Sequence, residues 1–314
     1  MRETKATRQI NKVVSLQGIC LPLTTCFDAN EDLDLVGLSA NIRRYKRSGI
    51  LGYVVLGSTG ERVNLNEEEY LRVVETARAQ TPSSMTFIVG AGQQSTRGTI
   101  NEIRAATNAG ADAILVLTPY FYRSAITQDA LVTYYNRVAD SSSIPVLLYS
   151  MPALTGIKIQ PETIASLAQH PNIIGVKDSS NDIEGFQQTV ELCPKDFAVL
   201  TGNGTVLFDA LKSGATGGIL AVGCAVPEAC VEIFELFRQG EIERAGQLQS
   251  KLTPFAAAVT TRFGIGGLKA ALDMAGYVGG VVRTPLAVPS EEQCAEILKL
   301  LNDLKALQVL GARD

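Results

Sequence analysis

The sequence predicts an α/β fold, a (β/α)8 TIM barrel with a C-terminal helical extension. Eight short segments rich in apolar residues alternate with helical patterns at spacings of roughly 20 to 35 residues. Most of these segments are continuously apolar, which is typical of parallel strands covered on both faces. Beyond Val226 the strand patterns stop and only helical patterns follow. Eight such units within about 220 residues fit a TIM barrel.

The predicted strands are short and most end in glycine-containing or polar turns. A doubly wound sheet is the competing architecture, but it rarely needs eight parallel strands. No G-x-G-x-x-G motif follows the first strand, where a dinucleotide-binding fold carries it. The barrel is therefore the preferred interpretation. Its strands fall within residues 18–27, 52–59, 86–92, 113–120, 145–152, 173–179, 197–203 and 217–224.

The intervening segments have the apolar spacing of amphipathic helices. The helix predicted from residue 67 has Asn66 as its N-cap and acidic residues in its first turn, which suit a helix N-terminus. Similar patterns cover residues 34–49, 96–111 and 127–142. Residues 227–240 would close the barrel, and residues 242–261, 264–277 and 290–307 form the extension. The predicted domains are an N-terminal extension (1–16), the barrel (17–240) and a C-terminal helical layer (241–314).

Composition excludes several classes of function. The net charge of −4 comes without a basic stripe, so no nucleic-acid partner is expected. No apolar run reaches the roughly 18 residues of a membrane span, and the N-terminus lacks a secretory signal. With His170 as the only histidine and no CxxC pair, no metal site is expected. The six cysteines indicate reduced thiols in a cytoplasmic protein. They are Cys20, Cys26, Cys193, Cys224, Cys230 and Cys294.

Lys177 is the first candidate for catalysis. It ends the apolar run of the sixth predicted strand, and active sites of TIM barrels lie at the carboxyl ends of their strands. Burial favours the neutral amine, which is the form that attacks a ketone to give a Schiff base. The competing interpretation is a buried ion pair with Asp178 or Glu61, which would add little net stability. We prefer the nucleophile.

Two other strand ends add partners for this lysine. The second strand ends in GSTGE, residues 57–61, where backbone amides with Ser58 and Thr59 can hold a carboxylate. The fifth strand ends at Tyr149, whose phenol could move a proton at the rim of the barrel. Alone, the first motif reads as an ordinary loop and the second as a packing tyrosine. Together with Lys177 they indicate one site.

The motifs GSTGE, YSMPALTG and GVKDS, in this order, resemble those of the pyruvate-dependent class I aldolases. This superfamily contains dihydrodipicolinate synthase, N-acetylneuraminate lyase and 4-hydroxy-2-oxoglutarate aldolase. The resemblance implies that Lys177 forms an imine with pyruvate and that Tyr149 relays protons. It implies that Ser58 and Thr59, with Gly57, hold the pyruvate carboxylate, and that Asn203 and Ile219 line the pocket. It also implies a homotetramer and no cofactor.

Departures from the synthase pattern bear on the substrate. Leu154 stands where synthases carry an arginine that grips the carboxylate of the second substrate. Phe121 replaces the tyrosine that completes the synthase proton relay, and Tyr120 or Tyr122 are the candidates to take its place. Ser179 is the candidate to contact an acceptor carboxylate. Leu154 and Phe121 depart from the 4-hydroxy-2-oxoglutarate aldolases too, but YSMPALTG, VKDSS and the C-terminal pattern ending in RTPL resemble those of that group. The resemblance therefore favours cleavage of 4-hydroxy-2-oxoglutarate to pyruvate and glyoxylate.

Three alternatives remain open at this point. One is 4-hydroxy-tetrahydrodipicolinate (dihydrodipicolinate) synthase, which condenses pyruvate with aspartate semialdehyde. Another is an aldolase or dehydratase acting on a sugar-derived 2-keto-3-deoxy acid through the same imine. The last is a 2-oxo-acid binding protein without catalysis, which the loss of the arginine suggests. All readings expect a small-molecule partner and neither nucleic acid nor a membrane.

Overall fold

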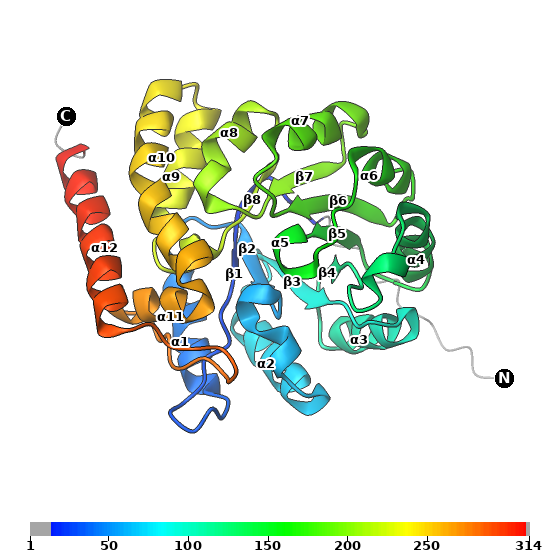
Figure 1. The fold of residues 1–314 in the computed structure, drawn as a ribbon, viewed down its shortest axis with the longest axis horizontal. Coiled ribbons are helices and arrows are strands. Elements are labelled where there is room, and N and C mark those ends of the chain that lie inside the picture. The colour runs from blue at the N-terminus through cyan, green and yellow to red at the C-terminus, as the bar shows by residue number, and fades with distance from the viewer. Residues whose placement is uncertain (1–13, 312–314) are drawn as a thin grey trace.

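The computed structural model describes residues 14–311, and eight parallel strands form a closed barrel in sequence order. The predicted TIM barrel is confirmed (Figure 1). Residues 1–13 of the predicted N-terminal extension lie outside the described residues. The strands are β1 (Gly18–Pro22), β2 (Gly52–Val55), β3 (Thr86–Ala91), β4 (Ala113–Leu117), β5 (Val146–Ser150), β6 (Ile173–Asp178), β7 (Ala198–Thr201) and β8 (Gly217–Ile219).

Helices surround the barrel, and the last three lie together on one side of it, yellow to red in Figure 1. Helix α10 packs against α9, and α12 packs against both α10 and α11. The barrel helices are α1 (Leu35–Tyr45), α2 (Glu67–Gln80), α3 (Thr96–Asn108), α4 (Gln128–Asp140), α5 (Pro152–Thr155), α6 (Pro161–Leu167), α7 (Ile183–Leu192), α8 (Leu207–Lys212) and α9 (Pro227–Arg238). The extension contains α10 (Ile242–Ala257), a π-helical turn (Ala258–Arg262), α11 (Gly264–Met274) and α12 (Glu291–Gly311).

Local sequence accounts for the helix starts. At α2 the Asn66 side chain accepts a hydrogen bond from the Glu69 backbone, and the Glu69 side chain accepts one from the Asn66 backbone. This capping box satisfies two donors that the helix itself cannot pair. Thr127 caps α4 in the simpler way, with its side chain accepting from Ala130. None of the described helices is long and apolar enough to cross a membrane.

Two apolar layers explain why the strands are apolar along both faces. One fills the barrel interior, where Val54, Ile88, Leu115, Leu147 and Ile219 meet. The other fills the space between the strands and the helices. Because both faces of each strand are buried, an alternating pattern would leave polar groups without water. The sixth strand keeps this pattern up to Lys177, whose register partner on β5 is Tyr149.

Candidate active site

Lys177 lies at the mouth of the barrel with only 4% of its surface exposed. Its Nζ atom is 4.5 Å from the centroid of the Tyr149 ring. Among the side chains that the structure describes, no carboxylate pairs with it. Asp178 instead accepts a hydrogen bond from the Ser180 backbone at 2.7 Å, and burial raises the pKa of its carboxyl. Glu61 pairs with a different lysine, so the ion-pair interpretation of Lys177 has neither of its proposed partners.

Gly202, just after β7, makes room for the lysine, and the sequence reasoning did not single it out. A Cβ atom at this position would lie 2.6 Å from Lys177 Cε and 1.9 Å from Ser179 Oγ. Any larger residue would therefore displace both side chains. The same geometry places Ser179, a predicted substrate contact, beside the lysine. Tyr149 thus comes from the neighbouring strand β5, and Ser179 comes from the loop that follows β6, the strand of Lys177.

Tyr149 connects the lysine to the loop that follows β2. Its hydroxyl is 3.3 Å from Ser58 Oγ, within hydrogen-bond distance. This loop begins and ends in unusual backbone geometry, because Leu56 (φ 58°) and Glu61 (φ 53°) both occupy the left-handed region. Such conformations cost on the order of 1–3 kcal/mol each and persist only where the surroundings impose them. The strain therefore marks residues 56–61 as a segment held in place by its neighbours.

The loop residues differ in their access to ligand. Gly57 and Ser58 line a cavity of about 410 Å³, whereas Thr59 is buried with 7% exposed. A Cβ atom at Gly57 would meet nothing within 4 Å, so protein packing does not require glycine there. The open space lies where a ligand could approach the backbone.

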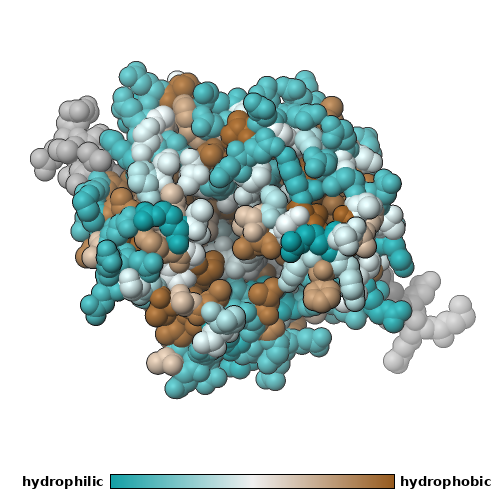
Figure 2. Space-filling model, in the orientation of Figure 1, coloured by the Kyte–Doolittle hydropathy of each residue, from teal (hydrophilic) through white to brown (hydrophobic). Residues whose placement is uncertain are grey.

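The walls of this cavity are mainly apolar. Tyr149 and Leu154 line it as predicted, and so does Tyr120, one of the two candidates for the missing relay tyrosine. Ile265, Pro285 and Leu286 of the C-terminal extension complete the wall, which the sequence reasoning did not foresee. Figure 2 shows hydrophobic side chains gathered around a hollow near the middle of the face seen in Figure 1. The extension therefore contributes directly to the candidate site.

Six predicted site residues are not among those that line this cavity. Lys177 and Ser179 lie beside each other next to Gly202, and Lys177 packs against Tyr149, which does line it. The Phe121 side chain is 72% exposed and packs edge-to-face on Tyr122, which is equally exposed. Asn203 is engaged locally, since its Oδ1 accepts hydrogen bonds from both the backbone and the hydroxyl of Thr205. Ile219 is fully buried in the barrel interior. Thr59, the last of the six, is buried in the loop that it shares with Ser58.

A second buried lysine, Lys269 of α11, was also missed. Its Nζ lies 2.6 Å from Glu61 Oε1, and both side chains are 1% exposed. Burial lowers the pKa of the Lys269 ammonium, and the Glu61 carboxylate opposes this shift. The signal was present in the sequence, because Lys269 falls on the apolar stripe of its helix, next to Leu268 and one turn before Leu272. A charge on such a stripe predicts a buried partner.

The thiols and carboxylates give no further reactive group. All six cysteines are free, and burial raises the pKa of Cys20 to about 12 and that of Cys193 to about 11. Thiols that ionise so high are poor nucleophiles at neutral pH. Within residues 14–311, no group of three or more His, Cys, Asp or Glu side chains is arranged to hold a metal ion.

The fold is a TIM barrel with a buried lysine beside a tyrosine at the carboxyl ends of its strands, where enzymes of this fold carry their active sites. The chain belongs to the dihydrodipicolinate synthetase family, whose model matches residues 15–304. Two curated relatives carry different activities. The 4-hydroxy-tetrahydrodipicolinate synthase of Methanothrix thermoacetophila is 34% identical over 93% of this chain and 98% of its own length. A probable mitochondrial 4-hydroxy-2-oxoglutarate aldolase of Emericella nidulans is 34% identical over 91% and 94%.

Solved structures agree with this assignment. A monomeric dihydrodipicolinate synthase variant superposes with a TM-score of 0.88 at 30% identity, covering 92% of this chain and 97% of that one. A prophage protein of the dihydrodipicolinic acid synthase family from E. coli K12, solved in complex with pyruvate, gives a TM-score of 0.87 at 30% identity. The match covers 92% of this chain and 99% of that one. Fold and family are thus established together.

Proposed function

We propose that this protein is a pyruvate-dependent class I aldolase in which Lys177 forms a Schiff base with a 2-oxo acid. One observation carries the proposal. Tyr149 contacts both Lys177, at 4.5 Å from ring centroid to Nζ, and Ser58, at 3.3 Å between hydroxyl oxygens. A nucleophile, a proton-transfer group and a hydroxyl that orients it are thereby side by side, which is the arrangement that covalent catalysis requires.

The reaction follows from these positions. The Lys177 amine attacks the C2 carbonyl of the 2-oxo acid, and loss of water from the carbinolamine leaves an iminium ion. Tyr149 takes the proton of the C4 hydroxyl while the C3–C4 electron pair moves into the iminium, so an aldehyde leaves. The resulting enamine is protonated at C3, and water hydrolyses the imine to release pyruvate and restore the Lys177 amine. Each proton transfer of this kind accelerates a reaction by roughly 10²–10⁴-fold.

The loop after β2 supports the pyruvate half of the substrate. Backbone amides beside Gly57 and Ser58 provide donors for the pyruvate carboxylate, and the empty space at Gly57 leaves room for it. Ser58 keeps the Tyr149 hydroxyl oriented toward the reacting atoms. The acceptor half of the substrate would occupy the cavity beneath Tyr120 and Leu154.

We infer 4-hydroxy-2-oxoglutarate as the favoured substrate, with glyoxylate as the aldehyde. Leu154 supports this choice against the synthase reaction, since a leucine cannot make the bidentate contact that an arginine makes with a carboxylate. The likeness to the Emericella nidulans aldolase also supports it. Ser179, beside Lys177, is the candidate hydroxyl for the glyoxylate carboxylate.

Dihydrodipicolinate synthesis is the second candidate. It is supported by several relatives named 4-hydroxy-tetrahydrodipicolinate synthase, among them those of Methanothrix thermoacetophila and Methanopyrus kandleri, at 34% and 33% identity. In this reaction the enamine on Lys177 would attack aspartate semialdehyde instead of being protonated. Among the described residues, Arg62 is the only basic residue that lines the cavity, and its guanidinium is engaged by Glu102. The second candidate therefore lacks a free cation among the described lining residues.

A substrate panel separates the candidates. Pyruvate release should be measured with 4-hydroxy-2-oxoglutarate, sugar-derived 2-keto-3-deoxy acids and N-acetylneuraminate, alongside condensation of pyruvate with aspartate semialdehyde. We expect the highest kcat/KM with 4-hydroxy-2-oxoglutarate. Faster turnover of aspartate semialdehyde would replace this assignment by the synthase. Binding of 2-oxo acids without any turnover would mean a binding protein.

Leu154→Arg should shift specificity toward the synthase reaction. We expect kcat/KM for aspartate semialdehyde to rise roughly tenfold or more, because a hydrogen bond to a charged group contributes about 1.5–3 kcal/mol. Neutral aldehydes should gain less. Leu298→Arg, on an exposed position of α12, is the matched control and should change neither rate. Efficient condensation by the natural protein would show that another residue already grips the semialdehyde.

Chelation should leave the reaction intact. The iminium on Lys177 supplies the electron sink that a metal ion would otherwise provide, so no divalent ion is needed for C–C cleavage. We expect kcat after dialysis against EDTA to match that of the untreated protein. Loss of activity that a divalent metal restores would contradict the Schiff-base mechanism.

We further propose that the protein acts in the cytoplasm as a homotetramer. The family resemblance supports the tetrameric state, and the free cysteines support a cytoplasmic location. The monomeric synthase variant among the solved relatives makes the monomer the alternative. Sedimentation equilibrium of the purified chain distinguishes the two states by mass.

A further inference from the structure

Charged side chains hold the loop after β2, residues 56–61, against the C-terminal extension. Glu61 ends this loop in the left-handed conformation, and its Oε1 pairs with Lys269 of α11 at 2.6 Å. Its Oε2 accepts hydrogen bonds from the Arg283 backbone at 3.1 Å and from Asn64 at 3.2 Å. A single buried carboxylate therefore ties its own loop to α11 and to the segment around Arg283, both far away in the sequence.

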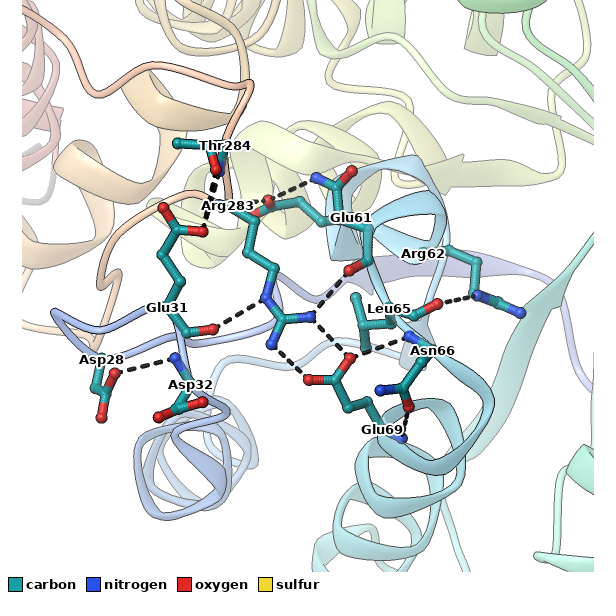
Figure 3. A network of polar contacts seen from close by, with 11 residues as sticks. Asp28, Glu31, Asp32, Glu61, Arg62, Leu65, Asn66, Glu69, Arg283 and Thr284 are labelled. Carbon is teal, nitrogen blue, oxygen red and sulfur yellow. Dashed lines mark hydrogen bonds and ion pairs between the residues drawn. The ribbon is translucent and has the colours of Figure 1, made fainter.

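Arg283 extends this contact to the neighbouring elements (Figure 3). Its Nη1 donates to Glu69 Oε2 of α2 at 2.8 Å and to the Asn64 carbonyl at 2.9 Å, and its Nε donates to the Glu31 carbonyl at 2.9 Å. Two residues later the same segment reaches the cavity, where Pro285 and Leu286 form part of the wall. Arg283 thus anchors the segment whose Pro285 and Leu286 form part of the cavity wall, and it also binds Glu61 at the end of the loop after β2.

Phe27 brings the two cations together. The Nζ of Lys269 and the guanidinium carbon of Arg283 are each 4.4 Å from the centroid of its ring. The ring is buried, with 2% exposed. An aromatic ring can stabilise nearby cations through its negative face. Phe27 therefore contributes to holding both cations next to Glu61.

Stability alone does not explain a buried ion pair of this kind. Desolvation of two charges offsets most of their attraction, and well-packed apolar residues would often serve as well or better. Such a pair fixes geometry, however, because each charge must stay within reach of the other. Here the pair fixes the geometry of residues 57–61. This loop contacts Tyr149 and forms part of the cavity wall.

We propose that Glu61, Lys269 and Arg283 are positioning residues that set the Ser58 hydroxyl against Tyr149 and thereby tie the C-terminal extension to catalysis. This inference rests on the proposed role of Ser58 and Tyr149 in the aldolase reaction. Lys269 holds the Glu61 side chain in place, and Glu61 in turn fixes the backbone of the loop that carries Ser58. Thr25, in the segment that follows β1, supports the same loop, since its hydroxyl donates to the Gly60 carbonyl at 2.7 Å.

The test is a double-mutant cycle with Ser58. Lys269→Met should lower kcat by roughly 10²-fold, since small displacements of a catalytic group can cost that much. Ser58→Ala lowers kcat by removing the hydroxyl itself, so adding Lys269→Met to it should cause little further loss. Fully additive losses would overturn the proposal, because they would mean that Lys269 acts independently of Ser58. Unchanged kcat in Lys269→Met would overturn it as well.

Controls separate positioning from folding. Arg262→Met removes an exposed ion pair with Glu296 in the same extension and should leave kcat unchanged. If Lys269→Met fails to fold, Arg283→Lys replaces it in the cycle. This variant keeps the positive charge but loses the bidentate contact of Arg283 with Glu69. Its loss of kcat should likewise vanish in the Ser58→Ala background, and additivity there would equally refute the role.

A second readout does not depend on the reaction. Hydrogen exchange of backbone amides in residues 57–64 should be faster in Lys269→Met, or in Arg283→Lys, than in the natural protein or Arg262→Met. Unchanged exchange would refute the positioning role even if the enzyme proves to be an aldolase. If exchange is faster in the variant but borohydride traps no adduct on Lys177 of the natural protein, the positioning of the loop is supported and the proposed function is refuted.

Discussion

Lys177→Met is expected to lower kcat by roughly 10⁴- to 10⁶-fold, the scale on which removal of a covalent nucleophile acts. Methionine fills a similar volume in the buried site but has no amine to attack a carbonyl. Lys177→Arg is the matched variant, because it keeps the positive charge and equally lacks a nucleophilic amine. If charge alone mattered, the arginine variant would retain turnover. We expect both variants to be inactive.

Borohydride trapping identifies the nucleophile directly. Reduction in the presence of pyruvate should add one pyruvate-derived group per chain, and peptide mapping should place it on Lys177. Lys269→Met provides the control for the other buried lysine, since it should still be labelled on Lys177. An adduct on a different lysine, or no adduct at saturating pyruvate, would contradict the mechanism.

Tyr149→Phe should lower kcat by roughly 10²–10⁴-fold, the usual contribution of general acid–base catalysis. Phenylalanine keeps the ring that packs against Lys177 and removes only the hydroxyl that reaches Ser58. The imine on Lys177 should therefore still form, although more slowly, and borohydride should still trap it. Loss of turnover with retained trapping assigns the hydroxyl to the steps after imine formation.

Tyr53→Phe is the matched control for this prediction. Tyr53 is also buried, and its hydroxyl donates to the Ile42 carbonyl at 3.1 Å in the layer between β2 and α1. Removal of that hydrogen bond should lower the free energy of unfolding by about 1 kcal/mol without changing kcat. Near-normal turnover in Tyr149→Phe would return Tyr149 to a packing role.

The sequence by itself determined the barrel and the chemical core of the site. Continuous apolar runs predict strands that are buried on both faces, and this is a local property of each segment. Lys177 could be identified because a charged side chain at the end of a buried apolar run is unfavourable unless it has a specific role. Asn66 could be named as an N-cap because capping involves residues three apart in the chain. These features depend on short stretches of sequence that carry their own physical signal.

Only the tertiary structure decided which side chains share the cavity. Pro285 and Leu286 reach it from the end of the chain, while Phe121 and Asn203 turn away from it. The pairing of Glu61 with Lys269 spans more than 200 residues, so no local pattern could connect the two charges. Contacts of this kind depend on where closure of the barrel and packing of the extension bring distant segments. The sequence therefore identifies the candidate reactive groups, whereas the packing of the C-terminal extension against the barrel decides how the loop beside them is held.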